Sequence, residues 1–117
     1  MSLKISIRRI DDIAILDLAG RLWVQEQPLQ DQVRSVLDQG GRFLILNLEN
    51  VDYIDSSGLG QLVSIWTSIR SRHGNIVLLK PTDRVRRLLR TTALYIVFDV
   101  FDEEERARSA VRRDWPK

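Results

Sequence analysis

The stretch Asp55-Ser56-Ser57-Gly58-Leu59-Gly60 is the place where small and polar residues separate two strongly apolar segments of the chain. The segment before it, Phe43-Leu44-Ile45-Leu46-Asn47-Leu48, is typical of a buried strand. The segment after it carries apolar residues at helical spacing, namely Leu59, Leu62, Val63, Trp66 and Ile69. We therefore expect the stretch to join the carboxyl end of a strand to the start of a helix, where open α/β sheets commonly bind their ligands.

The segments on either side alternate between strand and helix patterns. Residues 4–10 and 13–19 form a predicted antiparallel hairpin around the turn signal Asp11-Asp12, and Gly20 is expected to end its second strand. The further predicted elements are a helix over 27–38, a strand over 43–48, a loop over 49–55, a helix over about 57–72, a strand over 76–79, a helix that Thr82 or Asp83 caps, a short edge strand over 96–98, and a final helix that begins with a capping box at Asp102 and is covered by Trp115.

Helices between apolar strands imply parallel pairing through right-handed crossovers, and only the first strand should run antiparallel. The predicted fold is therefore α/β, with a mixed, mostly parallel sheet of four to five strands and about four helices. The 117 residues are expected to form one small domain, 1–117, which is large enough to bury a core without a disulfide or a metal.

The composition excludes several classes of protein. The chain has no cysteine, which removes disulfides, thiolate nucleophiles and thiolate metal sites. Its net charge of +2 is too small to argue for nucleic acid as a partner. No apolar run approaches the ~20 residues of a membrane span, and the N-terminus lacks the apolar core of a signal peptide. A cytoplasmic protein without membrane insertion is therefore expected.

The serines beside Asp55 raise the question of a catalytic nucleophile. A serine nucleophile needs a base within hydrogen-bond reach, and the only histidine of the chain is His73. In an unbroken helix His73 would lie roughly 24 Å from Ser57, at a rise of ~1.5 Å per residue. The Gly-x-Ser-x-Gly elbow, the Gly-Lys-Ser/Thr ending of a P-loop and a set of metal ligands are also absent. The sequence therefore predicts no enzyme, no catalytic residue and no metal site.

Three features each keep two interpretations. Ser56 or Ser57 is either the N-cap of the helix, with Gly58 allowing a tight turn, or a site of modification. Trp23 is either an exposed anchor for a protein partner, at the sheet edge that holds Ser57, or a lid over the helices. A set of basic residues is either a patch for an acidic partner or nucleic acid, or a solvated helix face: Lys80, Arg84, Arg86, Arg87 and Arg90, with Arg70 and Arg72 nearby in sequence.

The segment from Leu46 to Gly60, Leu-Asn-Leu-Glu-Asn-Val-Asp-Tyr-Ile-Asp-Ser-Ser-Gly-Leu-Gly, closely resembles the signature of STAS domains, in particular bacterial anti-sigma factor antagonists. The resemblance extends over nearly the whole chain, because it includes the hairpin ending in Gly20-x-Leu22, the apolar third strand, Leu78-Leu79-Lys80-Pro81 and the helix with Val85-x-x-Leu88-Leu89. It implies the STAS fold.

The resemblance also implies a phosphorylation switch. An unmodified antagonist binds an anti-sigma factor, which is a GHKL-type serine kinase, and thereby frees a sigma factor for transcription, for example in a stress response. The kinase uses ATP to phosphorylate the serine before the glycine, here Ser57, and the complex parts; a phosphatase is a further expected partner. Asp55 would flank the site, and Ser56, Gly58 and Leu59 would form its rim. The chain itself would need no cofactor.

Trp23 is where the chain departs from the family pattern. Many members carry an acidic residue directly after Gly-x-Leu, and a role of that residue, such as positioning the nucleotide of the partner kinase, does not carry over to a tryptophan. We expect Trp23 to contact the partner instead, and an exposed apolar region around it would favour a weak homodimer. The alternative function is a STAS module that binds its partner constitutively, in a signalling scaffold or a membrane transport complex, with Ser57 unphosphorylated and only a helix cap.

Overall fold

The computed structural model describes residues 3–23 and 28–113 of the chain. Their elements follow in the order β1 (Lys4–Ile10), β2 (Ile13–Leu22), α1 (Pro28–Asp38), β3 (Phe43–Ile54), α2 (Ser56–Ser71), β4 (Asn75–Leu79), α3 (Asp83–Thr91), a 3-10 turn (Leu94–Ile96), β5 (Val100–Phe101) and α4 (Glu104–Val111).

The strands form one five-stranded sheet in the order β1-β2-β3-β4-β5. β1 pairs with β2 antiparallel, and the other neighbouring strands pair in parallel. Each parallel pair is connected through a helix, as a crossover between parallel strands requires. The structure therefore confirms the predicted α/β fold with a single antiparallel strand at one edge.

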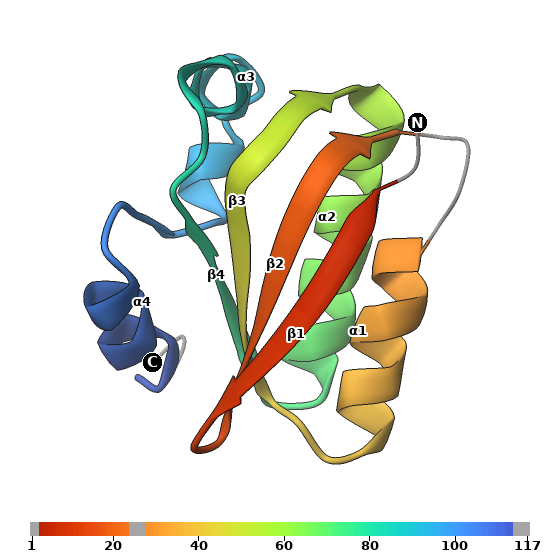
Figure 1. Cartoon of the computed structure of the whole chain (residues 1–117), viewed down its shortest axis with the longest axis vertical. Helices are drawn as coiled ribbons and strands as arrows, with labels where there is room; N and C mark the ends of the chain where they lie inside the picture. The colour runs from red at the N-terminus through yellow and green to blue at the C-terminus, as the bar shows by residue number, and fades with distance from the viewer. Residues whose placement is uncertain (1–2, 24–27, 114–117) are drawn as a thin grey trace.

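The helices are distributed over both faces and one end of the sheet (Figure 1). Helices α1 and α2 cover one face, α4 lies against the other, and α3 lies at the end toward which β2 and β3 run. The alternation of side chains along each strand divides the apolar residues between the two faces. The larger core, under α1 and α2, includes Leu16, Leu18, Val33, Leu46, Leu48, Leu62 and Ile65. The smaller core, under α4, consists of Ile13, Ile15, Ile45, Val77, Leu79, Ala107 and Val111.

The two central strands are longer than the sequence predicts. β2 continues through Gly20 to Leu22, and Gly20 adopts a φ of 116°, which an L-residue rarely does. The register between β2 and β3 shifts on both sides of this glycine. The expected loop over 49–55 is wrong for the same reason, because β3 pairs with the extended β2 as far as Ile54. The two strands thus deliver Leu22 and Ile54 side by side to the start of α2.

The last third of the chain holds the other differences. The predicted strand over 96–98 is wrong: Leu94–Ile96 form a 3-10 turn, and Phe98 fills the core from a position outside the sheet. The N–H groups of Leu78 in β4 and of Lys80, which directly follows β4, donate instead to the carbonyls of Asp99 and Phe101, so the edge strand is Val100–Phe101. The expected capping box at Asp102 is also wrong.

The final helix begins one residue past its N-cap Glu103, whose side chain makes no capping hydrogen bond. The predicted cover by Trp115 and the predicted helix start at Gln27 lie outside the described residues.

A polar network fastens α4 to the sheet. Arg8 of β1 donates from Nε to Asp17 Oδ2 at 2.6 Å and from Nη2 to Glu104 Oε1 at 2.8 Å. Asn47 of β3 donates from Nδ2 to Asp17 Oδ1 at 2.8 Å. The hydrogen bonds from Arg8 hold the pKa of Asp17 and of Glu104 below the ordinary values of these carboxyl groups, while burial opposes the shift.

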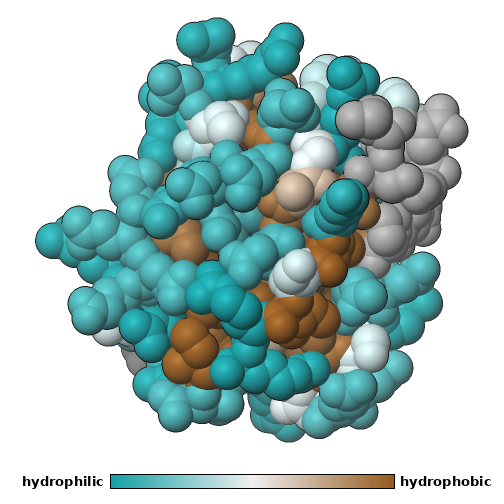
Figure 2. Space-filling model, viewed as in Figure 1, coloured by the Kyte–Doolittle hydropathy of each residue, from teal (hydrophilic) through white to brown (hydrophobic). Residues whose placement is uncertain are grey.

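The surface is mostly polar. Figure 2 shows that charged and polar side chains cover most of the face seen in Figure 1, with apolar residues visible between them near the middle. Among the described residues, no helix is long and apolar enough to cross a membrane. The exposed large apolar side chains of the described residues are Val63, Tyr95 and Ile96.

Candidate functional site

The start of α2 is capped by Asp55. This residue has extended backbone angles, φ −102° and ψ −175°, and its Oδ1 accepts the N–H of Gly58 at 2.8 Å. A carboxylate in this position satisfies a helix N–H that has no partner within the helix, and it faces the positive end of the helix dipole. Of the two interpretations of the serines, the one that makes Ser56 or Ser57 the N-cap is therefore wrong, because the carboxylate of Asp55 takes that role.

Both serines are exposed in the first turn of the helix. Ser56 is its first residue and Ser57 its second. The Ser57 hydroxyl makes no hydrogen bond with another residue that the structure describes. The Ser57 side chain is thus exposed to solvent at a helix N-terminus, and its hydroxyl forms no described hydrogen bond that would stabilise the fold.

Gly58 is buried because the end of β2 lies directly against it. A Cβ atom on Gly58 would stand 2.3 Å from the carbonyl oxygen of Leu22 and 2.9 Å from Cγ2 of Ile54. The same carbonyl accepts the N–H of Asp55 at 3.3 Å. The glycine is therefore required by close backbone packing, and not by the tight turn that the sequence suggested. Gly58 shapes the site through its backbone, while Leu59 packs partly buried against the larger core.

Trp23 lies at the same edge, directly after β2. Its carbonyl accepts a hydrogen bond from Nε2 of Gln61, one turn into α2, at 3.1 Å. Its indole is partly buried and lies outside both described core clusters, which argues against a lid on the core. Gln61 is itself buried, and sequence reasoning missed it because an isolated glutamine in an amphipathic helix carries no signal.

Arg21 connects Trp23 to the end of β3. Its guanidinium carbon lies 5.7 Å from the centroid of the Trp23 ring and 5.8 Å from that of the Tyr53 ring, within the range of a cation–π contact. The exposed arginine therefore contacts two aromatic rings at the end of the sheet where α2 begins.

Tyr53 also lines a groove. It has a volume of about 220 Å³ and lies between the end of β3 and α3, lined by Tyr53, Ile54, Arg84, Val85, Arg87, Leu88 and Thr91. Ile54 directly precedes the capping residue Asp55, so the groove borders the start of α2. The sequence did not predict it, because it arises where α3 packs against a distant strand.

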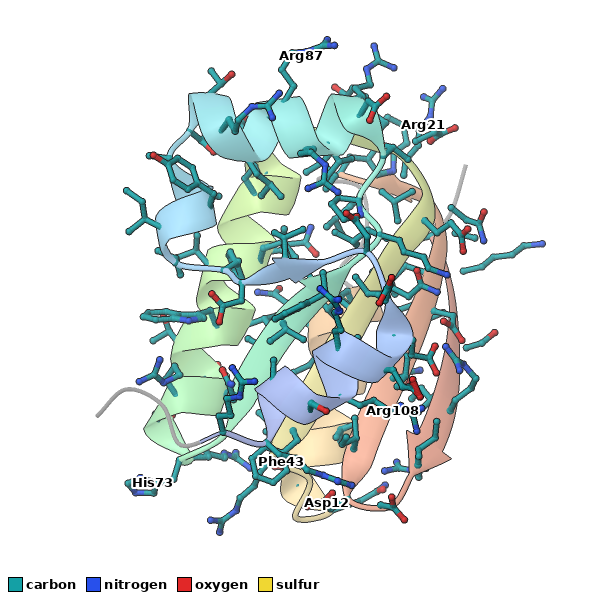
Figure 3. All side chains as sticks on the ribbon, turned by 90° about the vertical axis from the view of Figure 1, so that its left-hand side faces the viewer. Asp12, Arg21, Phe43, His73, Arg87 and Arg108 are labelled. Carbon is teal, nitrogen blue, oxygen red and sulfur yellow. The ribbon has the colours of Figure 1, made fainter. Side chains whose placement is uncertain are left out.

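His73 lies far from this edge. It follows the C-cap Arg72 of α2, whereas Ser57 stands at the opposite end of the same helix. In Figure 3, His73 lies at one end of the molecule and Arg21 and Arg87 at the other. His73 is therefore too far from Ser57 to act as its base within the same chain. The described residues also contain no group of acidic or histidine side chains that could hold a metal ion.

Comparison with known proteins identifies the family. The STAS domain model matches residues 4–107. The anti-sigma-B factor antagonist of Staphylococcus aureus (strain NCTC 8325 / PS 47) is 33% identical over 95 residues, which are 80% of this chain and 88% of that protein. The crystal structure of a provisionally assigned anti-sigma factor antagonist from Thermotoga maritima is 31% identical, with a TM-score of 0.81 over 93% of this chain and 95% of that one.

The anti-sigma factor antagonist SpoIIAA shares the fold in two forms. In its unphosphorylated form it has a TM-score of 0.78 at 22% identity, covering 93% of this chain and 96% of that one. In the phosphorylated form of the Bacillus protein, the TM-score is 0.72 at 21% identity, covering 93% of this chain and all of that one. The expected resemblance is confirmed by these comparisons: the chain belongs to the STAS domain family, among relatives named anti-sigma factor antagonists.

Proposed function

We propose that this chain is an anti-sigma factor antagonist that binds an anti-sigma factor through the edge around Ser57 and releases it when Ser57 is phosphorylated. Relatives named anti-sigma factor antagonist support the general role. The observation that carries the switch is the exposed Ser57 hydroxyl in a helix that Asp55 caps. Because Asp55 caps the helix, a group added to Ser57 leaves the cap in place.

The electrostatics of the site support a switch that acts on binding and not on folding. A phosphate adds a charge of about −1.5 to −2 at neutral pH. At a helix N-terminus this charge meets the positive end of the dipole and exposed backbone N–H groups, which stabilise it. The carboxylate of Asp55 opposes it at short range. Against the surface of a docked partner the same charge would be desolvated, and the complex would be weakened.

The chemistry of the transfer belongs to the partner. In this proposal the anti-sigma factor is a GHKL-type kinase that uses ATP, a phosphatase restores the unmodified serine, and the chain itself needs no cofactor and catalyses nothing. Partner contacts come from Asp55, Ser56, Ser57 and Leu59 at the helix start, and from Trp23 beside it. Since a sigma factor acts with RNA polymerase inside the cell, the proposal includes a cytoplasmic location.

The test is phosphate transfer from the anti-sigma kinase encoded with this protein. Incubation with the kinase and ATP should add one phosphate, detected by intact mass spectrometry and mapped to Ser57. Ser57→Ala should abolish the transfer. Ser56→Ala is the matched control, because Ser56 is also exposed and occupies the preceding helix position, and this variant should still be phosphorylated at Ser57.

Two outcomes would overturn the proposal. A kinase that binds the protein and phosphorylates another substrate, yet leaves Ser57 unmodified, favours a constitutive STAS interaction module. Phosphorylation of Ser56 instead of Ser57 in the unaltered protein would show that the proposal names the wrong serine.

A further inference from the structure

The groove between β3 and α3 combines an apolar floor with basic walls. Ile54 and Val85 are 6% and 1% exposed and form its floor with the partly buried Leu88. Arg84 and Arg87 line it from α3, where both are exposed. Neither arginine forms an ion pair with a residue that the structure describes, in contrast to Arg86, which binds Asp102 at 2.6 Å. No carboxylate is among the described lining residues, so the groove is basic without internal neutralisation.

Tyr53 supplies the aromatic side chain of the groove and also contacts Arg21. The guanidinium carbon of Arg21 lies within cation–π distance of both the Tyr53 ring and the Trp23 ring. A third exposed arginine thus stands at the same end of the molecule as the two on α3, as the positions of Arg21 and Arg87 in Figure 3 show. Basic and aromatic side chains therefore gather at the end of the molecule where α2 begins.

We propose that this groove docks an acidic segment of the partner protein, with one apolar side chain on the floor and carboxylates against Arg84 and Arg87. Its volume of about 220 Å³ is below the ~300 Å³ at which sites for whole small molecules begin, and it suits a side chain. Charge complementarity favours an acidic segment, because guanidinium groups pair with carboxylates. The apolar floor favours a segment that also carries an apolar side chain.

The inference rests on the proposed function for the identity of the partner, but the groove can be tested without it. The probe is a fluorescein-labelled peptide of about ten residues with alternating glutamate and leucine, titrated by anisotropy against the full chain. Saturable binding is expected, with amide shifts in an NMR spectrum centred on Tyr53, Arg84 and Arg87. A peptide with lysine in place of glutamate should not bind.

Charge reversal identifies the site. The double variant Arg84→Glu/Arg87→Glu should weaken peptide binding at least tenfold. The matched control Arg42→Glu/Arg113→Glu changes the net charge equally, at exposed arginines outside the groove, and should weaken it less than about twofold. Thermal unfolding of both variants checks that the fold is retained.

Three results would overturn the inference. They are the absence of saturable binding, equal weakening by the two double variants, and tighter binding of a single-stranded oligonucleotide than of the acidic peptide. If Ser57 is not phosphorylated by the kinase while the groove still binds the peptide, the proposed switch fails and the docking site stands.

Discussion

Three neighbouring residues have different roles at the start of α2. Asp55 caps the helix through its carboxylate, Ser57 presents a hydroxyl to solvent, and Gly58 admits the backbone of β2. None of these tasks can be moved to the next position, because the cap must precede the helix and the contact with Leu22 fixes where the glycine stands. Asp55 and Gly58 thereby leave the hydroxyl of Ser57 exposed at the helix N-terminus.

The close approach at Gly58 predicts a steep cost for any side chain there. Gly58→Ala should lower the free energy of unfolding by about 2 kcal/mol or more, since the backbone of Leu22 must move to admit the methyl group. Gly60→Ala is the control in the same helix, because a Cβ atom there meets nothing within 4 Å. It should raise the free energy of unfolding by about 0.5–1 kcal/mol. Urea unfolding measures both, and equal effects would contradict the packing argument.

At the scale of elements, α4 depends on polar contacts as well as on its small apolar face. Its buried side chains are only Ala107, Ala110 and Val111. Arg8 joins Glu104 of this helix to Asp17 of the sheet, and Asn75 donates from Nδ2 to the carbonyl of Val111 at 3.2 Å. The helix that completes the second face of the sheet is therefore held partly by groups whose charge depends on pH.

Acid should weaken this attachment. Asp17 and Glu104 have pKa values below the ordinary 3.8 and 4.5 because of the hydrogen bonds from Arg8. Carboxyl groups whose pKa is lowered by folding stabilise the fold above their unfolded pKa, and this contribution is lost as the pH falls through the lower folded values. Arg8→Ala should therefore cost about 1 kcal/mol at pH 7, since the pairs are partly exposed, and flatten the decline in stability below about pH 4.5.

The control is Arg9→Ala. Arg9 lies on the same strand, and its guanidinium donates to the neutral amide oxygen of Gln39 and to no carboxylate among the described residues. Urea unfolding of the unaltered protein and both variants, between about pH 3 and pH 7, gives the comparison. Parallel pH curves for the unaltered protein and Arg8→Ala would show that the network does not stabilise the fold.

The elements with strong periodicity could be predicted from the sequence, and the others could not. Helix α2 was placed to within one residue at either end, because its apolar residues recur regularly and Gly74-Asn75 follows it. The apolar run at 96–98 predicts a strand that the structure does not contain. Apolar residues in a turn can also be buried in the core, as Phe98 is. Strand β5 has two residues, and only its hydrogen bonds to β4 define it.

The candidate site divides in the same way. The position of Ser57 after a strand and at a helix start follows from local pattern, so the sequence could predict it. The cap by Asp55 could not be separated from a cap by serine, because both residue types serve equally well. Gln61 and the groove beside Tyr53 depend on which distant elements meet, and those contacts leave no local pattern in the sequence.

At the scale of the whole molecule, the candidate site lies at one end of the domain. The ends of β2 and β3, the start of α2 and helix α3 gather at one end, whereas α4 lies against the opposite face from α1 and α2 (Figure 1). A charge added to the exposed Ser57 would therefore change the surface at this end of the molecule without contact with the core. The proposed switch is a change in affinity between two folded proteins.

The dissociation constant of the complex with the cognate kinase tests this claim most directly. It should be measured by calorimetry for the unmodified protein, for the protein phosphorylated at Ser57 and for Ser57→Ala, with circular dichroism of each form. We predict that phosphorylation weakens binding at least tenfold, that Ser57→Ala binds like the unmodified protein, and that all three keep the same spectrum. Equal affinity of the phosphorylated and unmodified forms would contradict the account.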